Sequence, residues 1–248
     1  MTITLITVVL NCVDTISDTI NSVLSQTYKD IEYILIDGGS TDGTLDIIYE
    51  YESKFNGKMH VFSEPDTGVY NAINKGITLA KGDVIGLLHA DDLFSCDSIL
   101  ERVARGLTDK WVDLVYGDVV FVDSKDTSKV VRKYSARRFT PDKLRYGYAP
   151  PHPSLYCKKE LFERYGLYKE NYITAADFEM FVRLFRHSSV LSKYLPIEMV
   201  IMRMDGISSQ WKHRLTTNVF EKRRALRENN VRISLFSLLR KYYYLLNP

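Results

Sequence analysis

Apolar runs and amphipathic segments alternate along the first half of the chain. Residues 3–10 are almost wholly apolar and rich in β-branched side chains, which is typical of a parallel strand buried on both faces. Shorter apolar runs at 31–36, 61–63 and 84–88 have the same character. Apolar side chains recur at helical spacing within 16–24, 45–51, 69–77 and 99–107. The pattern predicts strand–helix–strand units with right-handed crossovers, and therefore a parallel sheet.

The second half of the chain continues with longer apolar elements. Runs at 114–122 and 197–204 predict strands, and residues 130–134 are expected to pair back as a hairpin. Three prolines stiffen the segment 149–156, which is expected to become a strand. An apolar face made by Phe178, Phe181, Val182 and Phe185 predicts a helix that opens near residue 176. These elements predict an α/β fold with a central, mostly parallel sheet flanked by helices.

Acidic side chains follow three of the predicted strands. Asp37 follows the second strand, Asp66 the third, and Asp91 with Asp92 the fourth. The carboxyl ends of parallel strands meet at one edge of a sheet, where ligands bind in open α/β folds. The acids therefore predict a site for a polyol, a base or a metal-bound phosphate at that edge. The alternative is that these acids, together with Asp42, satisfy the amides of turns and helix caps.

Composition adds limits on class and compartment. The chain has 248 residues, a net charge of +2 and an ordinary globular composition, which suits one large α/β domain or a domain with an appendage. Cys12, Cys96 and Cys157 are widely spaced and form no metal-binding pattern, so reduced thiols in a cytosolic protein are expected. No signal peptide is expected, because the sequence opens without a basic leader. No apolar run reaches the roughly 18 residues of a transmembrane helix.

Positive charge gathers in two stretches of the second half. Lys133, Arg137 and Arg138 form a small cluster, which we interpret as a solvated surface, with binding of an acceptor phosphate as the alternative. From residue 212 to the end there are nine Lys or Arg and two Glu. Residues 233–246 are apolar with basic and aromatic flanks, which predicts an interfacial helix on an anionic membrane surface. A helix packed on the domain, or against a second subunit in a homodimer, is the alternative. No nucleic-acid-binding motif accompanies the charge.

Three motifs together carry a family resemblance. They read I-D-G-G-S-T-D-G-T at 36–44, E-P-D-T-G-V-Y-N-A-I-N-K-G at 64–76, and L-H-A-D-D at 88–92. In this order they resemble the family 2 glycosyltransferases of the GT-A fold, of the kind that builds bacterial polysaccharide, O-antigen or capsule. The resemblance extends from residue 3 to about residue 208. It implies a GT-A fold with a Rossmann-like sheet.

The resemblance implies a nucleotide-sugar site at the strand ends. It assigns nucleotide contacts, usually to uridine, to Val9, Asn11, Asp37, Gly38, Asp66, Lys75 and Ala90. The family's D-x-D motif, which holds Mn²⁺ or Mg²⁺ against the diphosphate, reads His89-Ala90-Asp91 here. Asp91 is thus the implied metal ligand. His89 replaces the first acid and is a weaker candidate, with an imidazole better suited to Mn²⁺.

The same resemblance implies catalytic and acceptor-side residues in the second half. The family's catalytic base lies in a Glu-Asp pair that reads Ala176-Asp177 here, so Asp177 inherits that role, while Glu179 is expected to face outward or to pack. Without the resemblance, Asp177 would be an ordinary acid at a helix N-terminus. Acceptor-side residues are His152, as a lining residue, with Asp92 and Asp118. Ser208, Lys212 and Arg214 belong to an implied lid over the diphosphate, with Gly206 as a hinge.

These expectations define a domain division and a function. Residues 1–208 form the glycosyltransferase domain, with a nucleotide-sugar half at 1–118 and an acceptor half at 119–208, and 209–248 form a basic helical extension. The expected activity is inverting transfer from a UDP-sugar to a hydroxyl of a lipid-linked saccharide, on the inner face of the cell membrane, for lipopolysaccharide or capsule synthesis. The alternatives are a GDP-sugar-using transferase and a non-catalytic nucleotide-sugar-binding or scaffold protein. A pyrophosphorylase is disfavoured, because residues 10–13 carry no basic glycine-rich signature.

Overall fold

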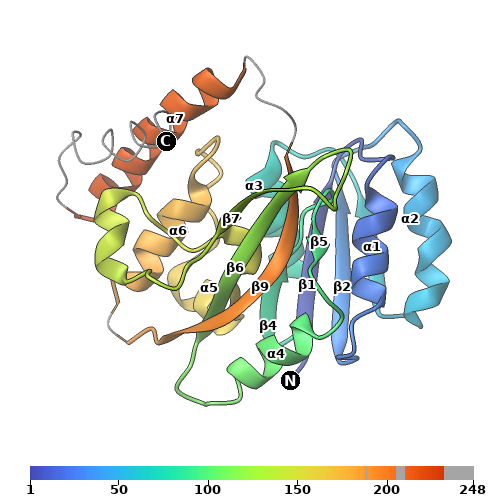
Figure 1. Cartoon of the computed structure of the whole chain (residues 1–248), viewed down its shortest axis with the longest axis horizontal. Coiled ribbons are helices and arrows are strands. Elements are labelled where there is room, and N and C mark those ends of the chain that lie inside the picture. Colours follow the sequence, from blue (N-terminus) through green and yellow to red (C-terminus); the bar gives the residue numbers. More distant parts are fainter. Residues whose placement is uncertain (188, 205–209, 232–248) are drawn as a thin grey trace.

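A computed structural model describes residues 1–187, 189–204 and 210–231, the last range with its side chains from residue 217 onward. One mixed sheet lies at its centre (Figure 1), in the order β3-β2-β1-β4-β8-β6-β9-β5 with β7 paired to β6. The strands that run in a common direction are β1 (Ile3–Val9), β2 (Ile31–Asp37), β3 (Met59–Ser63), β4 (Val84–Leu87), β6 (Leu114–Asp123) and β9 (Ser192–Met204). Antiparallel to their neighbours are β5 (Leu93–Phe94), β7 (Val130–Tyr134) and β8 (Tyr156–Lys158).

Helices cover both faces of the sheet. On one face lie α1 (Ile16–Leu24), α2 (Thr44–Glu52) and α4 (Ile99–Gly106), and on the other lie α3 (Val69–Leu79), α5 (Glu160–Tyr165) and α6 (Ala176–Phe185). The last described helix, α7 (Gln210–Glu228), packs on α6, and short 3-10 turns occupy Ser53–Phe55, Pro141–Tyr146 and His152–Ser154. Strand β2 shows why the sheet is a middle layer: Tyr33 and Leu35 enter one core, while Ile34 and Ile36 enter the other. The predicted α/β fold is confirmed.

The structure differs from the expected elements mainly in the second half. Strand β9 begins at Ser192, five residues before the predicted start at 197, and β5 and α5 were not expected. The proline segment does not enter the sheet until Tyr156. Ser154 instead closes a turn, with its N–H and its hydroxyl both bonded to the carbonyl of Pro151 at 3.0 and 2.9 Å. The expected helix at 233–246 lies outside the described residues.

Within the described part of the chain, no helix has both the length and the apolar character that crossing a bilayer demands.

Candidate active site

The ends of β1, β2 and β3 lie level at the carboxyl edge of the sheet, because Val9 pairs with Asp37 and Asp37 pairs with Ser63. Asp37 is fully buried there. Its carboxylate accepts hydrogen bonds from the N–H groups of Gly39 and Ser40 and from the hydroxyls of Ser40 and Ser63, at 2.5–3.2 Å. These bonds are the turn-forming role that the sequence left open. A nucleoside contact of Asp37 stays a prediction.

The loops that follow β1 and β2 hold each other in place. Asn11 has a left-handed backbone (φ 52°), which asparagine tolerates better than most residues. Its side-chain oxygen accepts the Thr41 N–H at 2.9 Å, and its own N–H donates to the Ser40 hydroxyl at 2.8 Å. Asp42 accepts the N–H of Val13 at 3.1 Å. The edge of the sheet at the ends of β1, β2 and β3 is the predicted binding site of the sugar donor, and we call it the donor edge. Its backbone is held in place by short polar side chains.

Gly38, Asp66 and Lys75 form the third part of this edge. The Gly38 N–H donates to the Val9 carbonyl at 2.9 Å, and the Val9 side chain is buried in the core. A nucleotide contact of Val9 stays a prediction. A Cβ on Gly38 would lie 2.6 Å from the Asp66 carboxylate, so a residue without a side chain is needed for this approach. Lys75 pairs with Glu64 at 2.8 Å and braces the loop that carries Asp66. Two of the predicted strand-end acids, Asp37 and Asp66, therefore belong to neighbouring parts of this edge.

Asp91 is exposed just beyond β4, on a loop that is held through its backbone. The Ala90 carbonyl accepts the Thr15 hydroxyl, and the Asp91 carbonyl accepts the Arg203 guanidinium, both at 2.9 Å. Arg203 also pairs with Asp18 at 2.5 Å. Among the described residues, no three His, Cys, Asp or Glu side chains converge on one point. An exposed carboxylate on a fixed backbone fits a hard cation that takes its other ligands from phosphate and water.

Asp92 does not lie on the acceptor side, which corrects the expectation. It is 1% exposed, and its Oδ2 has no hydrogen-bond partner. Burial, with a smaller effect from the Asp91 charge, raises the pKa of Asp92 well above its usual value. The chain turns inward after Asp91. The Thr19 hydroxyl of α1 donates a hydrogen bond to the Asp92 carbonyl at 2.9 Å and so holds Asp92 in its buried position.

A cavity of about 480 Å³ opens beside this edge, between α3, the β6–β7 hairpin, α6 and α7. A volume of this size suits a sugar-sized ligand. Its titratable lining residues include Tyr70, His89, His152, Asp177 and Lys222, each from a different segment of the chain, together with Arg132 and Tyr134 of β7. The structure thus brings together three predicted residues, His89, His152 and Asp177, which are far apart in sequence.

Asp177 lies in the first turn of α6 and is half-buried. Burial raises the pKa of its carboxyl group, while the Lys222 charge, the Phe178 N–H and the His89 charge act in the opposite direction. Burial lowers the pKa of Lys222, against the effect of the Asp177 charge. A carboxylate whose basicity is increased by burial, yet which stays beside a cation, is suited to accept a proton.

Burial favours the neutral form of both histidines of the cavity. Burial lowers the pKa of His89, although the charges of Asp91 and Asp177 oppose this effect. Burial and the neighbouring His89 lower the pKa of His152 to about 3. The two rings lie 6.0 Å apart, and His152 Nε2 is 2.8 Å from the Tyr168 hydroxyl. Both rings therefore serve as hydrogen-bonding walls of the cavity, which agrees with a lining role for His152.

Asp118 also departs from its predicted place. Its carboxylate accepts the Ala136 N–H at 2.8 Å and the Tyr194 hydroxyl at 2.9 Å, so it joins β6 to the loop after β7 and to β9. It is absent from the described lining of the cavity. The predicted lid residue Ser208 lies outside the described residues, and Lys212 and Arg214 belong to the part of α7 whose side chains are not described.

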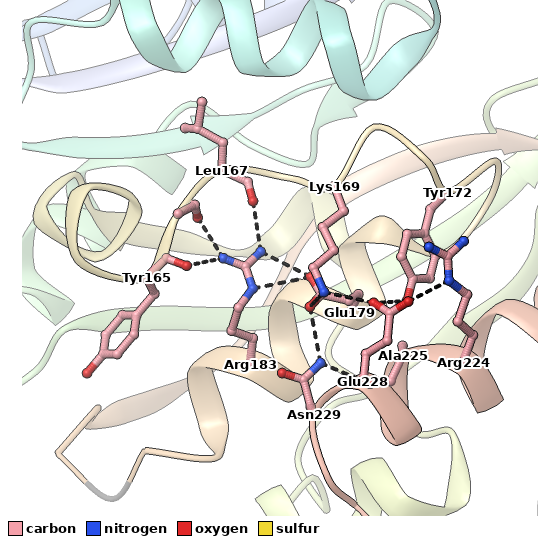
Figure 2. Close-up of polar contacts among 11 residues, drawn as sticks. Tyr165, Leu167, Lys169, Tyr172, Glu179, Arg183, Arg224, Ala225, Glu228 and Asn229 are labelled. Atoms are coloured by element: carbon pink, nitrogen blue, oxygen red, sulfur yellow. Dashed lines mark hydrogen bonds and ion pairs between the residues drawn. The ribbon is translucent and has the colours of Figure 1, made fainter.

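A buried polar network docks α7 on α6 (Figure 2). Glu179 is fully buried and pairs with Lys169 at 2.9 Å and with Arg183 at 3.1 Å. Asn229, just beyond α7, donates to Glu179 at 3.1 Å, and Glu228 pairs with Lys169 at 2.8 Å. Glu179 is therefore a packing acid, one of the two roles expected for it. A buried charge with several partners fixes the position of the helix that carries Lys222.

Helix α7 also holds the loop that leads into Asp177. Glu221 is buried and accepts the N–H groups of Ile173 and Thr174 at 2.6 and 2.7 Å. Sequence reasoning assigned Lys212 and Arg214 of this helix to the site but missed Glu221 and Lys222, because these two residues stand in an ordinary charged run. Tyr70 was also missed, although it is the tyrosine of the motif at 64–76.

The sequence matches the family model for glycosyl transferase family 2 over residues 4–166. A PGL/p-HBAD biosynthesis glycosyltransferase of Mycobacterium bovis is 33% identical over 190 residues, which are 76% of this chain and 71% of that protein. A chondroitin synthase of Pasteurella multocida is 29% identical over 174 residues, which are 70% of this chain and 18% of that protein. The chain therefore belongs to glycosyltransferase family 2, as the three motifs indicated.

Solved structures agree on the fold. Staphylococcus aureus TarS 1-349 in complex with UDP-GlcNAc aligns with a TM-score of 0.69 and 16% identity, over 89% of this chain and 66% of that one. The mannosyltransferase PcManGT from Pyrobaculum calidifontis, in complex with GDP-Man and Mn²⁺, aligns with a TM-score of 0.66 and 17% identity, over 95% and 71%. The chain spans only 39% of a longer TarS structure. The GT-A fold is confirmed.

Proposed function

We propose that this glycosyltransferase moves a sugar from a UDP-sugar to a hydroxyl of a saccharide acceptor, with inversion at the anomeric carbon. The observation that carries the proposal is that Asp177 and His89 line the same cavity. His89 stands two residues before Asp91, in the loop that follows β4. A candidate base and a candidate diphosphate contact thus lie on adjoining parts of one site. The aligned TarS structures that hold UDP-GlcNAc and UDP support a uridine nucleotide.

The proposed reaction is a single displacement. The Asp177 carboxylate takes the proton of the acceptor hydroxyl while that oxygen forms a bond to the anomeric carbon. The bond from this carbon to the UDP oxygen breaks, and UDP leaves with the electron pair. The α-linked donor therefore gives a β-linked product. General-base assistance of this kind contributes roughly 10²–10⁴-fold to rate.

The other cavity residues have supporting roles in this scheme. The Lys222 charge favours the ionised form of Asp177 against the effect of burial, and His89 and His152 orient hydroxyls by hydrogen bonding. Mn²⁺ or Mg²⁺, which Asp91 would hold with His89 nearby, neutralises charge on a diphosphate when it is bound. The nucleotide contacts proposed for Asn11, Asp37, Gly38, Asp66 and Lys75 belong to the same edge.

The acceptor is proposed to be a lipid-linked saccharide used for cell-surface polysaccharide such as lipopolysaccharide or capsule. The names of the matched relatives concern a glycolipid and a polysaccharide, which supports this class of product. We place the enzyme at the inner face of the cell membrane, with residues 233–246 on anionic lipid. Flotation with phosphatidylglycerol vesicles tests this: Arg240→Gln/Lys241→Gln should weaken binding, and equal binding would contradict the placement.

A GDP-sugar donor is the second candidate, because an aligned structure holds GDP-Man. Calorimetric titration of UDP and GDP, with and without Mn²⁺, separates the two donors. We expect Mn²⁺-dependent binding of UDP that weakens at least tenfold in Asp91→Asn but not in Asp97→Asn, which neutralises an exposed acid just beyond β5. Tight GDP binding would select the second candidate. Failure to bind either nucleotide would favour a non-catalytic scaffold.

A further inference from the structure

A second cavity, of about 500 Å³, adjoins the candidate active site. Its lining is Tyr134, Ser135, Ala136, Arg138, Phe139, Lys143, Tyr146 and Tyr148. Tyr134 lines both cavities, and its hydroxyl donates to the carbonyl of Ala149 at 2.9 Å, a residue of the first cavity. A ligand that passes Tyr134 would therefore extend from Asp177 into the second cavity.

This second cavity lies in a strongly basic stretch. Residues 130–148 contain six Lys or Arg and one acid, a net charge of +5 (6 − 1), whereas the whole chain has +2. Lys133 pairs with Glu198 and Arg145 with Asp142, so their charges are compensated. The basic residues that line the cavity are Arg138 and Lys143, and none of its described lining residues is acidic. The cavity is therefore complementary to an anion.

The backbone of Arg138 holds the side chain of Lys143 in place. The Lys143 ammonium donates a hydrogen bond to the carbonyl of Arg138. Arg138 is exposed, and its planar guanidinium can bind two oxygens of one phosphate at once. These features favour a phosphate over a single carboxylate oxygen.

Aromatic rings form the remaining walls. Tyr146 and Tyr148 are 46% and 41% exposed, although large aromatic side chains usually bury more of their surface. A tyrosine offers an apolar ring face and a polar tip. A pyranose ring has the matching surface, with C–H groups on its face and hydroxyls at its rim. An aromatic wall beside two cations therefore suits a sugar that carries a phosphate.

We propose that the second cavity binds a phosphate-bearing sugar of the acceptor, while the hydroxyl to be glycosylated lies near Asp177. The phosphate meets Arg138 and Lys143, and the sugar ring packs on Tyr146 and Tyr148. This proposal rests on the proposed function, which places an acceptor in the first cavity. It selects acceptors whose anionic group lies close to the reacting hydroxyl, because the two cavities share Tyr134.

The test uses the whole 248-residue chain saturated with UDP and Mn²⁺, so that the donor site is filled. Glucose 1-phosphate, methyl α-glucoside and inorganic phosphate are titrated separately and followed through the backbone amide resonances. We expect glucose 1-phosphate to shift resonances of residues 134–148 and to bind at least fivefold tighter than either other probe. Arg138→Gln/Lys143→Gln should lose at least fivefold of that affinity, and Tyr146→Ser should weaken it as well. Lys129→Gln, at the exposed hairpin turn, is the matched control.

Each other result overturns the proposal. Equal binding of inorganic phosphate would remove the sugar from the assignment, and equal binding of methyl α-glucoside would remove the phosphate. Shifts that are absent from 134–148, or unchanged in the double variant, would reject the site. Binding of phosphatidylglycerol vesicles through Arg138 and Lys143, without binding of glucose 1-phosphate, would make this surface a membrane contact.

Hydrolysis of the UDP-sugar in the absence of acceptor separates this proposal from the proposed function. We expect Arg138→Gln/Lys143→Gln to hydrolyse the donor at the wild-type rate, because neither residue lies in the donor site. If the wild type neither binds UDP nor hydrolyses any UDP-sugar, the proposed function fails. The titration of glucose 1-phosphate, repeated without nucleotide, then still decides whether residues 134–148 bind such a sugar.

Discussion

The two halves of the site use the same kind of side chain in opposite ways. At the donor edge, the carboxylates of Asp37 and Asp42 are occupied by hydrogen bonds from their own and neighbouring loops. In the cavity, Asp177 is half-buried, and the opposing effects of burial and of the Lys222 charge set its pKa. The first arrangement fixes the shape of a backbone, and the second maintains a reactive ionisable group.

The difference shows how burial should be read for an acidic residue. Asp37 is the more deeply buried of the two, yet it is the one whose polar atoms are fully used by the protein. Satisfied hydrogen bonds stabilise a buried carboxylate, whereas incomplete compensation makes its protonation easy to change. The hydrogen-bond partners of an acid, rather than the depth of its burial, therefore distinguish an acid with a structural role from one suited to proton transfer.

The largest expected effect comes from removing the candidate base. Asp177→Asn should lower sugar transfer by about 10²–10⁴-fold, because the amide cannot take a proton from the acceptor. UDP affinity should stay at the wild-type value, and the melting temperature should not fall, since the change removes a partly desolvated charge. Product formation, calorimetry and thermal unfolding measure the three quantities. Glu163→Gln, at an exposed acid of α5, is the control, and wild-type turnover in Asp177→Asn would exclude Asp177 as the base.

Asp37→Asn should have the opposite signature. Its new NH₂ group would face N–H and hydroxyl donors in place of an acceptor oxygen, which costs about 1–3 kcal/mol of unfolding free energy. We expect a lower denaturation midpoint, together with weaker UDP binding as the loop loosens. The matched control is Asp14→Asn, which changes an exposed acid near the same edge. A variant as stable as the wild type would mean that Asp37 does not organise the loop.

Lys222→Met should change the pH dependence of transfer. Loss of the Lys222 charge removes an effect that lowers the pKa of Asp177, so that pKa rises further. Because the base works when it is ionised, the acidic limb of kcat/KM should move to higher pH, by about one pH unit. Lys222→Arg should keep the wild-type profile, and Arg227→Met removes an exposed charge of the same helix as a control. An unmoved limb with lower activity at every pH would indicate a purely structural role.

The smallest effect concerns the docking of α7. Although burial acts in the other direction, hydrogen bonds from Lys169, Arg224 and Tyr172 lower the pKa of Glu228 to about 2, from 4.5. Ionised Glu228 therefore adds stability that is present above pH 4.5 and is lost as the pH falls towards 2. Thermal unfolding across this range should show a shallower acid limb for Glu228→Gln than for the wild type. Parallel limbs would show that this network does not couple docking to pH.

The sequence predicted the donor half better than the cavity. Residues 1–94 are built from short βαβ units, in which apolar runs and the polar residues that end them are read locally. Asp91 and Asp92 show the limit of this reading: they are neighbours, and the turn of the chain leaves one exposed and buries the other. The cavity was harder to predict, because Lys222 approaches Asp177 only through the packing of α7 on α6. No local motif marks such a contact.

The place of α7 in the chain has a consequence for biosynthesis. Domains generally fold from the N-terminus during translation, and all residues that make the parallel contacts of β1 to β4 have been added before residue 100. Lys222 and Glu221 are added more than a hundred residues later. The nascent protein therefore passes through a stage with an assembled nucleotide edge and an unfinished proton acceptor. A sugar donor bound by such a chain would not be used for transfer. Transfer would begin only after α7, the last described helix, has folded onto α6.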